Sequence, residues 1–209
     1  MGNLPRHLPT AVEGTSALNE AGGENEVYTV KEAEALLSKA PDWLLPTLAI
    51  KLFSGIRTEK LFRMDWSALK FDQDAIILAK QITKTRQRRV VPLLPNLKLW
   101  LSPFQKSKGP IAHRWSSPKT MSCAWTQFAT TAGVPYNRIA MRKSYLSYRI
   151  AQIKNLDQVA LESGNSPEVI QRDYRELVTE DAAKRWFAIS PAKWSLLFLD
   201  ISNRTSLDR

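Results

Sequence analysis

The feature that most constrains the fold is a change in the spacing of the apolar residues along the chain. Most of the sequence has apolar residues at helical spacing, but the β-branched runs 75–79 and 89–94 break this pattern. The polar segment between them predicts an antiparallel hairpin, and segment 65–71 is a candidate third strand. Helical spacing returns at Pro95. The sequence therefore predicts a single, mostly helical α+β domain, in which about eight helices surround one small antiparallel sheet.

Local signals mark where several of these helices begin and end. Thr29 followed by Glu32 forms a capping box, which predicts a helix from about residue 29 to residue 39. A largely buried second helix follows, with Pro46 tolerated in its first turn and an end expected at Gly55. The remaining helices are expected at about residues 58–64, 95–101, 118–131, 138–153, 156–163, 167–174 and 180–187.

Composition divides the chain and narrows its class. Residues 1–26 are rich in Gly, Pro, Asn and Glu without hydrophobic periodicity, which is typical of a disordered leader or linker. Residues 27–190 are expected to form one domain, and 191–209 a C-terminal tail packed on the chain's own core. With no secretion signal and no run of about 20 apolar residues, we expect a cytoplasmic protein that does not bind membranes. One cysteine and two histidines leave little for a disulfide, a zinc cluster or a Ser-His-Asp triad.

Positive charge is concentrated in the part of the chain that is expected to fold. The formal net charge is +10, and residues 1–27 hold one Arg and four Glu, so residues 28–209 carry +13. Such a charge suggests a polyanionic partner, most often a nucleic acid, although a solvated cationic surface is the alternative. Charge alone does not separate DNA from RNA or from an acidic membrane.

Two arginines lie where a solvated surface residue is not expected. Arg142 falls inside an apolar stripe on its helix, which is formed by Ile139, Leu146, Ile150 and Ile153. An arginine there snorkels to solvent, pairs with a carboxylate or points at a bound anion. Arg57 directly follows a glycine break between two apolar helices, which raises the same question.

Four segments, taken in order, resemble the catalytic domain of the tyrosine recombinase (phage integrase) family. "GIRTEKLFRMDW" resembles the first arginine box and contains Arg57, while "KTRQRRVVPL" resembles the hairpin segment and begins with Lys84. "MRKSYLSYR" resembles the second arginine box and contains Arg142. "SGNSPEVIQRDY" resembles the closing segment: it ends in Tyr174, nine residues after Asn165, which stands where the family has His or Trp. The resemblance covers nearly the whole expected domain.

The resemblance implies cleavage and rejoining of DNA strands in site-specific recombination or integration, without a metal or a cofactor. Tyr174 would attack a phosphodiester to give a 3′-phosphotyrosyl link and a free 5′-hydroxyl. The guanidinium groups of Arg57 and Arg142 suit the charge that develops on the phosphate oxygens. Lys84 would protonate the leaving 5′-oxygen, and Asn165 would donate a hydrogen bond to the phosphate.

Several positions depart from the family pattern. Ile139, three residues before Arg142, stands where the family has His, Asp or Asn, and it cannot carry a proton. Lys143 stands where the family often has His. Lys60 stands where the family has an acidic residue, and the neighbouring Glu59 could take over the role of that residue. Groups that stabilise charge are thus kept while groups that handle protons are weakened.

Double-stranded DNA is the partner that the resemblance implies, bound by a homo-oligomer, a tetramer in this family. The basic residues beside the boxes are expected to contact it: Arg86, Arg88, Arg89 and Lys143. Family members usually carry an N-terminal DNA-binding domain, where this sequence has the leader, so we expect weak binding that is mostly to phosphates. The family also suggests that the apolar stretch 194–201 docks on a neighbouring protomer.

Two other hypotheses remain open. The chain could be a DNA-binding relic of the same fold that no longer cleaves, which Ile139 and Lys60 favour. It could also be a basic helical adaptor without phosphoryl chemistry, in which Arg57 and Arg142 serve stability alone.

Overall fold

The computed structural model describes residues 27–79, 88–136, 139–174 and 178–191, and the side chain of Tyr174 lies outside that description. The expected leader 1–26 and all of the expected tail except Pro191 also lie outside the described residues. Within them the chain forms nine α-helices, two short 3-10 helices and one sheet. The prediction of a mostly helical α+β fold with a small antiparallel sheet is confirmed.

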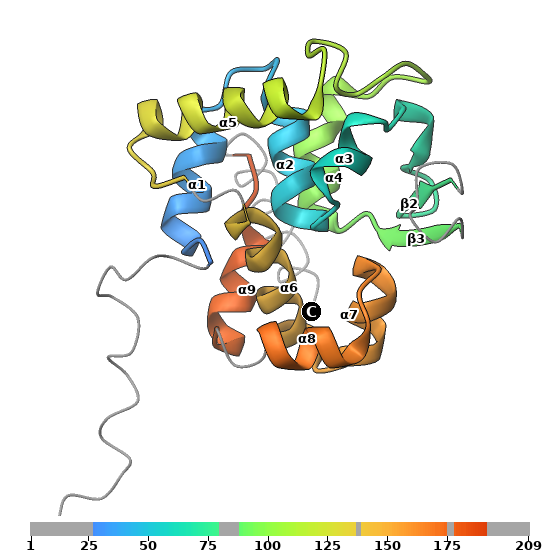
Figure 1. Cartoon of the computed structure of the whole chain (residues 1–209), viewed down its shortest axis with the longest axis vertical. Helices are drawn as coiled ribbons and strands as arrows, with labels where there is room; N and C mark the ends of the chain where they lie inside the picture. Colours follow the sequence, from blue (N-terminus) through green and yellow to red (C-terminus); the bar gives the residue numbers. More distant parts are fainter. Residues whose placement is uncertain (1–26, 80–87, 137–138, 175–177, 192–209) are drawn as a thin grey trace, which may run out of the picture.

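Along the chain the helices form two groups, one before residue 133 and one after residue 139 (Figure 1). The first group and its partners are α1 (Val30–Lys39), α2 (Leu45–Ser54), α3 (Thr58–Phe62), η1 (Trp66–Ala68), α4 (Pro95–Leu101), η3 (Ser102–Phe104) and α5 (Pro118–Ala132). The second group is α6 (Ala140–Ile153), α7 (Leu156–Ser163), α8 (Pro167–Tyr174) and α9 (Glu180–Ala188). Among these described elements, none is both long enough and apolar enough to span a bilayer.

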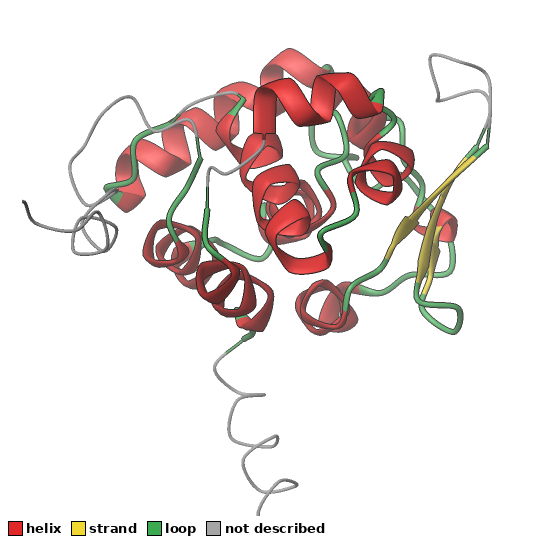
Figure 2. Ribbon diagram, turned by 90° about the horizontal axis from the view of Figure 1, so that it is seen from below, coloured by secondary structure: helices red, strands yellow, loops and turns green. Residues whose placement is uncertain are grey.

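The sheet has the antiparallel order β1-β2-β3 and lies at one edge of the molecule (Figure 2). Its strands are β1 (Leu69–Lys70), β2 (Ala75–Leu78) and β3 (Arg89–Pro92). In the β2–β3 register Ile76 lies opposite Val91, and Leu78 lies opposite Arg89. Both the predicted hairpin and the candidate third strand are therefore present, and Arg89 is the residue that begins β3.

Local signals account for the first two helices. Thr29 caps α1 through the backbone of Glu32, whose carboxylate accepts the Thr29 backbone N–H at 2.7 Å, so the predicted capping box is confirmed. Every residue of α2 is buried, and Pro46 lies in its first turn, as predicted. The helix ends at Gly55, whose φ of 59° is the left-handed conformation that favours glycine.

The core joins the two groups of helices around α2. Tyr148 of α6 stacks on Trp186 of α9, with ring centroids 4.2 Å apart and planes 13° apart, and Phe53 of α2 meets Trp186 edge-on. The Tyr148 hydroxyl also donates to the carbonyl oxygen of Tyr28 at 2.9 Å, which fixes the entry to α1. A smaller cluster joins α6, α7 and α8: Tyr145, Leu146, Val159, Ala160 and Ile170.

One prediction about α6 is wrong. Ile139 was expected within the apolar stripe of a helix starting near residue 138, but it precedes the helix and is 57% exposed. Ile139 is the N-terminal boundary residue of α6, and its side chain is exposed to solvent, whereas the side chain of Leu146 is buried.

Candidate active site

Arg57 owes its position to the glycine that ends α2. A Cβ on Gly55 would lie 2.5 Å from Cδ1 of Tyr145, so the ring of Tyr145 packs directly against this backbone. The buried Lys51 donates from Nζ to the carbonyl oxygen of Ile56 at 3.0 Å, which holds the following residue. The chain then turns into α3 with Arg57 as its N-terminal boundary, and the Arg57 side chain is exposed.

Arg142 lies in the first turn of α6 and is only 7% exposed. Its Nη1 donates to the carbonyl oxygen of Gly55, and its Nη2 donates to the carbonyl oxygen of Ser163 at 3.0 Å. The same Nη2 lies 3.1 Å from Oδ1 of Asn165. The position of Arg142 in an apolar stripe is thus explained by backbone and amide oxygens that receive its guanidinium.

The acceptors come from the turn Ser163–Gly164–Asn165, which we call the 163–165 turn. It follows α7 because Gly164 has a φ of 66°, and the N–H groups of Gly164 and Asn165 both donate to the carbonyl oxygen of Ala160. The carbonyl oxygens of Ser163 and Gly164 remain as acceptors for the arginines, and the negative end of the α7 helix dipole favours cations there.

Arg57 reaches the same turn from the opposite segment. Its Nη2 donates to Oδ1 of Asn165 at 2.5 Å, and its two Nη groups lie 3.2 and 3.3 Å from the carbonyl oxygen of Gly164. Oδ1 of Asn165 thus accepts from both Arg57 and Arg142. Because this oxygen is engaged twice, the amide NH₂ of Asn165 is the group left to donate.

A third guanidinium joins them. Nη1 of Arg89 donates to the carbonyl oxygen of Ser163 at 2.7 Å, and we call Arg57, Arg89 and Arg142 the arginine cluster. Among the described residues, no carboxylate forms a salt bridge with Arg57 or Arg89. Arg57 and Arg89 thus add two positive charges whose acceptors at the 163–165 turn are uncharged oxygens, which is an arrangement that can receive an anion.

A buried polar network lies next to the 163–165 turn and is centred on Glu162, the residue before Ser163. The carboxylate of Glu162 accepts from the Tyr145 hydroxyl at 2.9 Å and from Nε and Nη2 of Arg149 at 3.0 and 2.9 Å. Gln158 adds a fourth donor at 3.0 Å. Burial, followed by the charge of Glu162, raises the pKa of the Tyr145 hydroxyl, so it stays protonated and donates. Burial opposes the charge of Arg149, but its hydrogen bonds to Glu162 and the charge of that carboxylate raise its pKa overall.

Tyr174 is the last residue of α8, and the structure describes its backbone alone. Helix α8 packs against both α6 and α7 (Figure 1). The neighbouring residue agrees with this, because hydrogen bonding from Arg172 lowers the pKa of Asp173 and the charge of Lys143 contributes to the same shift.

The other predicted site residues lie outside the arginine cluster or outside the described residues. Lys84 and Arg86 lie outside the described residues, and Arg88, which directly precedes β3, is exposed. Desolvation, and then the charges of neighbouring arginines with Arg63 first, lowers the pKa of Lys60. The structure thus brings together Arg57, Arg142 and Asn165, while the predicted DNA contacts stay predictions.

Two parts of this arrangement were missed at the level of the sequence. Arg89 was predicted to contact DNA, yet its guanidinium lies against Ser163. The Arg149–Glu162 pair was not predicted, although one signal was present: Arg149 follows Arg142 by seven residues and so shares its helix face.

Comparison with known proteins gives a result at the level of the fold. No family model and no curated protein matches the sequence. The structure matches an integrase from mycobacterium phage Brujita with a TM-score of 0.59, at 11% identity over 91% of this chain. It also matches the XerA recombinase with a TM-score of 0.62, at 12% identity over 90% of this chain.

The chain spans 62% of the length of the matched phage integrase chain and 65% of the matched XerA chain. The predicted resemblance to the tyrosine recombinase catalytic domain is thereby confirmed at the level of the fold, which this chain shares with a phage integrase and a recombinase.

Proposed function

We propose that this chain cleaves and rejoins DNA strands through a covalent tyrosine intermediate, as the catalytic domain of a site-specific recombinase or integrase. The observation that carries the proposal is the convergence of Arg57 and Arg142 on Oδ1 of Asn165. The three residues come from three of the four segments that resemble the family.

Binding of a phosphodiester would replace uncharged acceptors by charged ones. Hydrogen bonds from a guanidinium to an anionic oxygen are roughly twice as strong as those to a neutral oxygen. Arg57 is exposed, so a DNA strand can approach it from solvent, whereas Arg142 is fixed by Gly55 and Ser163. The free NH₂ of Asn165 would add a third donor to the phosphate.

The chemical step then conserves the phosphodiester bond energy. The Tyr174 oxygen forms a bond to phosphorus as the bond from phosphorus to the 5′-oxygen breaks, and the tyrosine proton is lost to solvent or to a nearby base. Lys84 donates a proton to the leaving 5′-oxygen. Attack by a 5′-hydroxyl on the phosphotyrosyl link reverses these changes and rejoins the DNA.

One residue weakens this scheme. The exposed Ile139 carries no proton where the family has a proton-handling group, and loss of one general acid or base typically costs about 10²–10⁴ in rate. We therefore propose a slow enzyme, in which Lys143 beside Arg142 is the candidate to replace the missing proton-handling group. The same departure favours the second candidate function, a DNA-binding relic that does not cleave.

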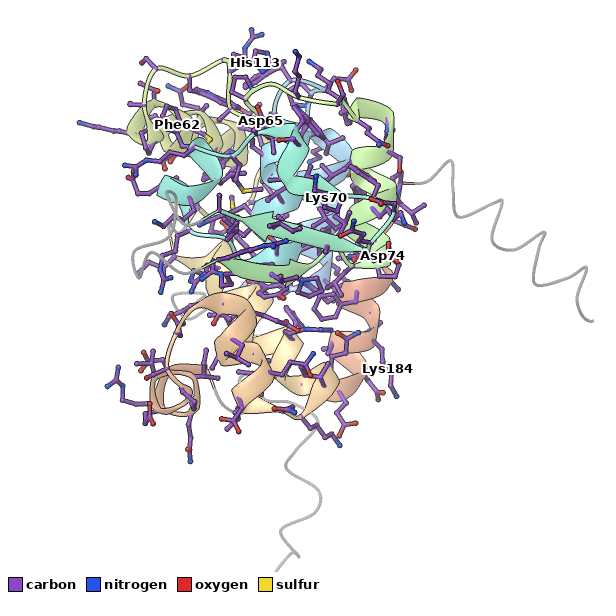
Figure 3. The ribbon with its side chains drawn as sticks, turned by 90° about the vertical axis from the view of Figure 1, so that its right-hand side faces the viewer. Phe62, Asp65, Lys70, Asp74, His113 and Lys184 are labelled. Atoms are coloured by element: carbon purple, nitrogen blue, oxygen red, sulfur yellow. The ribbon has the colours of Figure 1, made fainter. Side chains whose placement is uncertain are left out.

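A trapping experiment separates the two functions. The 209-residue chain is incubated with duplexes that have randomised centres and a nick in one strand, so that the short leaving fragment diffuses away. Covalent complexes are then counted after denaturation. We expect an adduct that Tyr174→Phe, Arg57→Ala and Arg142→Ala each abolish, while Lys184→Ala, at an exposed site on α9, keeps it (Figure 3). DNA binding without any adduct would instead establish the relic.

Partners and location follow from the same proposal. Double-stranded DNA is the substrate, held in addition by Arg86, Arg88 and Lys143, and two duplexes would be joined by a homo-tetramer in the cytoplasm. Exposed Arg88 suits contact with a phosphate because its guanidinium is open to solvent.

A further inference from the structure

Arg89 differs from the other basic residues that were predicted to bind DNA. Its side chain is half-buried, and it begins β3, which packs against α7 (Figure 1). Its Nη1 lies 2.7 Å from the carbonyl oxygen of Ser163, the oxygen that also accepts from Nη2 of Arg142 at 3.0 Å and lies 3.5 Å from Nη1 of Arg57. Three guanidinium groups thus meet at one carbonyl.

Gly164 fits this contact in two ways. Its φ of 66° is rarely adopted by residues with a Cβ, and a Cβ placed there would overlap Nη1 of Arg89. The glycine therefore both ends α7 and leaves space for the guanidinium. Arg89 and Gly164 depend on each other through this close approach.

The electrostatic setting of Arg89 is unfavourable in the absence of an anion. Burial, and then the charge of Arg57, lowers the pKa of Arg89 to about 10, so it remains protonated near neutral pH. Its buried Nε finds no acceptor among the described residues. A phosphate beside Arg57 would relieve the repulsion between these like charges.

We propose that Arg89 is a positioning residue of the active site rather than a contact to the outside of the DNA. It holds the Ser163 carbonyl in the place where Arg57 and Arg142 bind it, and so sets the geometry of both guanidiniums. This inference rests on the proposed function, because the geometry matters for attack on a phosphate.

The first test separates positioning from surface binding by two measurements on the full chain. Lys70→Ala is the matched control, since it removes one cation from the edge strand of the same sheet (Figure 3). We expect Arg89→Ala to lower the rate of adduct formation at saturating DNA by about 10²-fold, because a displacement of about 1 Å has such an effect. The salt dependence of DNA binding should stay that of the wild type, and Lys70→Ala should form adduct at the wild-type rate.

The opposite pattern would overturn the inference. If Arg89→Ala forms adduct at the wild-type rate and its slope of log K against log[salt] falls by about one, Arg89 is an ordinary phosphate contact. Arg89→Lys keeps the charge without the forked donors, so a positioning role predicts that it does not restore the rate that Arg89→Ala loses.

A second test does not need cleavage. Gly164→Ala is made in the wild type and in Arg89→Ala, and urea unfolding measures each variant. The Ala change should destabilise the chain less when Arg89 is absent, because the overlap is then removed and the backbone strain alone remains. Additive effects would contradict the proposed contact. If the wild type forms no adduct, the proposed function fails, while this cycle still decides where Arg89 lies.

Discussion

At the scale of single residues, Asn165 is the link between the two arginines. One amide oxygen accepts from Arg57 at 2.5 Å and from Arg142 at 3.1 Å, so a single neutral side chain holds both guanidinium groups. A neutral acceptor does not cancel the positive charge of the guanidinium that it binds.

Substitution of Asn165 by a carboxylate should therefore separate stability from activity. We expect Asn165→Asp to unfold at an equal or higher temperature, because the new charge pairs with Arg57 and Arg142. Adduct formation should fall by about 10²–10³, since the cluster is neutralised and the NH₂ donor is lost. Thermal unfolding and DNA trapping of the same preparation measure both effects. Asn165→Ala, which loses the donor without adding charge, should be less impaired, and equal losses would argue against neutralisation.

Ile139 offers the reverse test, a gain of function. Its side chain is 57% exposed before the first turn of α6, so a histidine can be placed there without disturbing the core. We expect Ile139→His to raise the rate of adduct formation at least tenfold, given the usual contribution of about 10²–10⁴ from a general acid or base. Trapping kinetics at neutral pH measure this, with Ile139→Ala as a control at the wild-type rate. A histidine without effect would indicate that another group already handles the proton.

At the scale of elements, α6 and α7 are joined by a buried ion pair. Glu162 and Arg149 are 6% and 8% exposed, and the carboxylate accepts four hydrogen bonds. Such pairs stabilise little relative to apolar packing but are expensive to break. The position of Glu162 just before Ser163 connects the stability of α7 to the geometry of the 163–165 turn.

Loss of one member of the Arg149–Glu162 pair should lower the free energy of unfolding much more than replacement of both members by apolar residues. We expect Glu162→Ala to lower the free energy of unfolding by about 3–5 kcal/mol, because it leaves the Arg149 charge buried without its acceptor. The double change Arg149→Met with Glu162→Leu should be near neutral in urea unfolding. A small cost for the single change would mean that water reaches Arg149.

The glycines that end two helices allow a comparison of strain with overlap. Gly55 and Gly133 both have positive φ, of 59° and 74°, but Gly133 has open space around it, while Gly55 lies against Tyr145. Gly55→Ala should cost about 1–3 kcal/mol more than Gly133→Ala, because the ring has to move. Urea unfolding of the two variants gives the difference. Equal costs would show that backbone strain alone governs both sites.

The sequence was sufficient where the signal is local. The capping box at Thr29, the break at Gly55 and the change of spacing at β2 and β3 depend on neighbouring residues, and each was predicted correctly. The approach of Arg89 to Ser163 depends on a contact between residues 74 positions apart, for which no spacing rule exists. The position of Ile139 was wrong because helical periodicity does not tell where the first turn begins.

At the scale of the whole molecule, charge dominates the expected interaction with DNA. Residues 28–209 carry a net charge of +13, so binding to duplexes of random sequence should weaken steeply with salt. We expect a linear fall of log K with log[salt], with a slope of several units and little dependence on sequence. Fluorescence anisotropy at a series of salt concentrations measures the slope. Binding that is insensitive to salt would argue against a phosphate-based interface.

The oxygens that occupy the arginine cluster also bear on how binding free energy is used. In the free chain, Ser163 and Asn165 already satisfy donors of Arg57 and Arg142, so a resting phosphodiester gains little when it displaces them. The pentacoordinate phosphorus of the reaction carries more charge and gains more from the same exchange. Differential binding of this kind raises the turnover number without raising the affinity for uncut DNA. Such an enzyme would release uncut DNA readily and still stabilise the transition state of strand exchange.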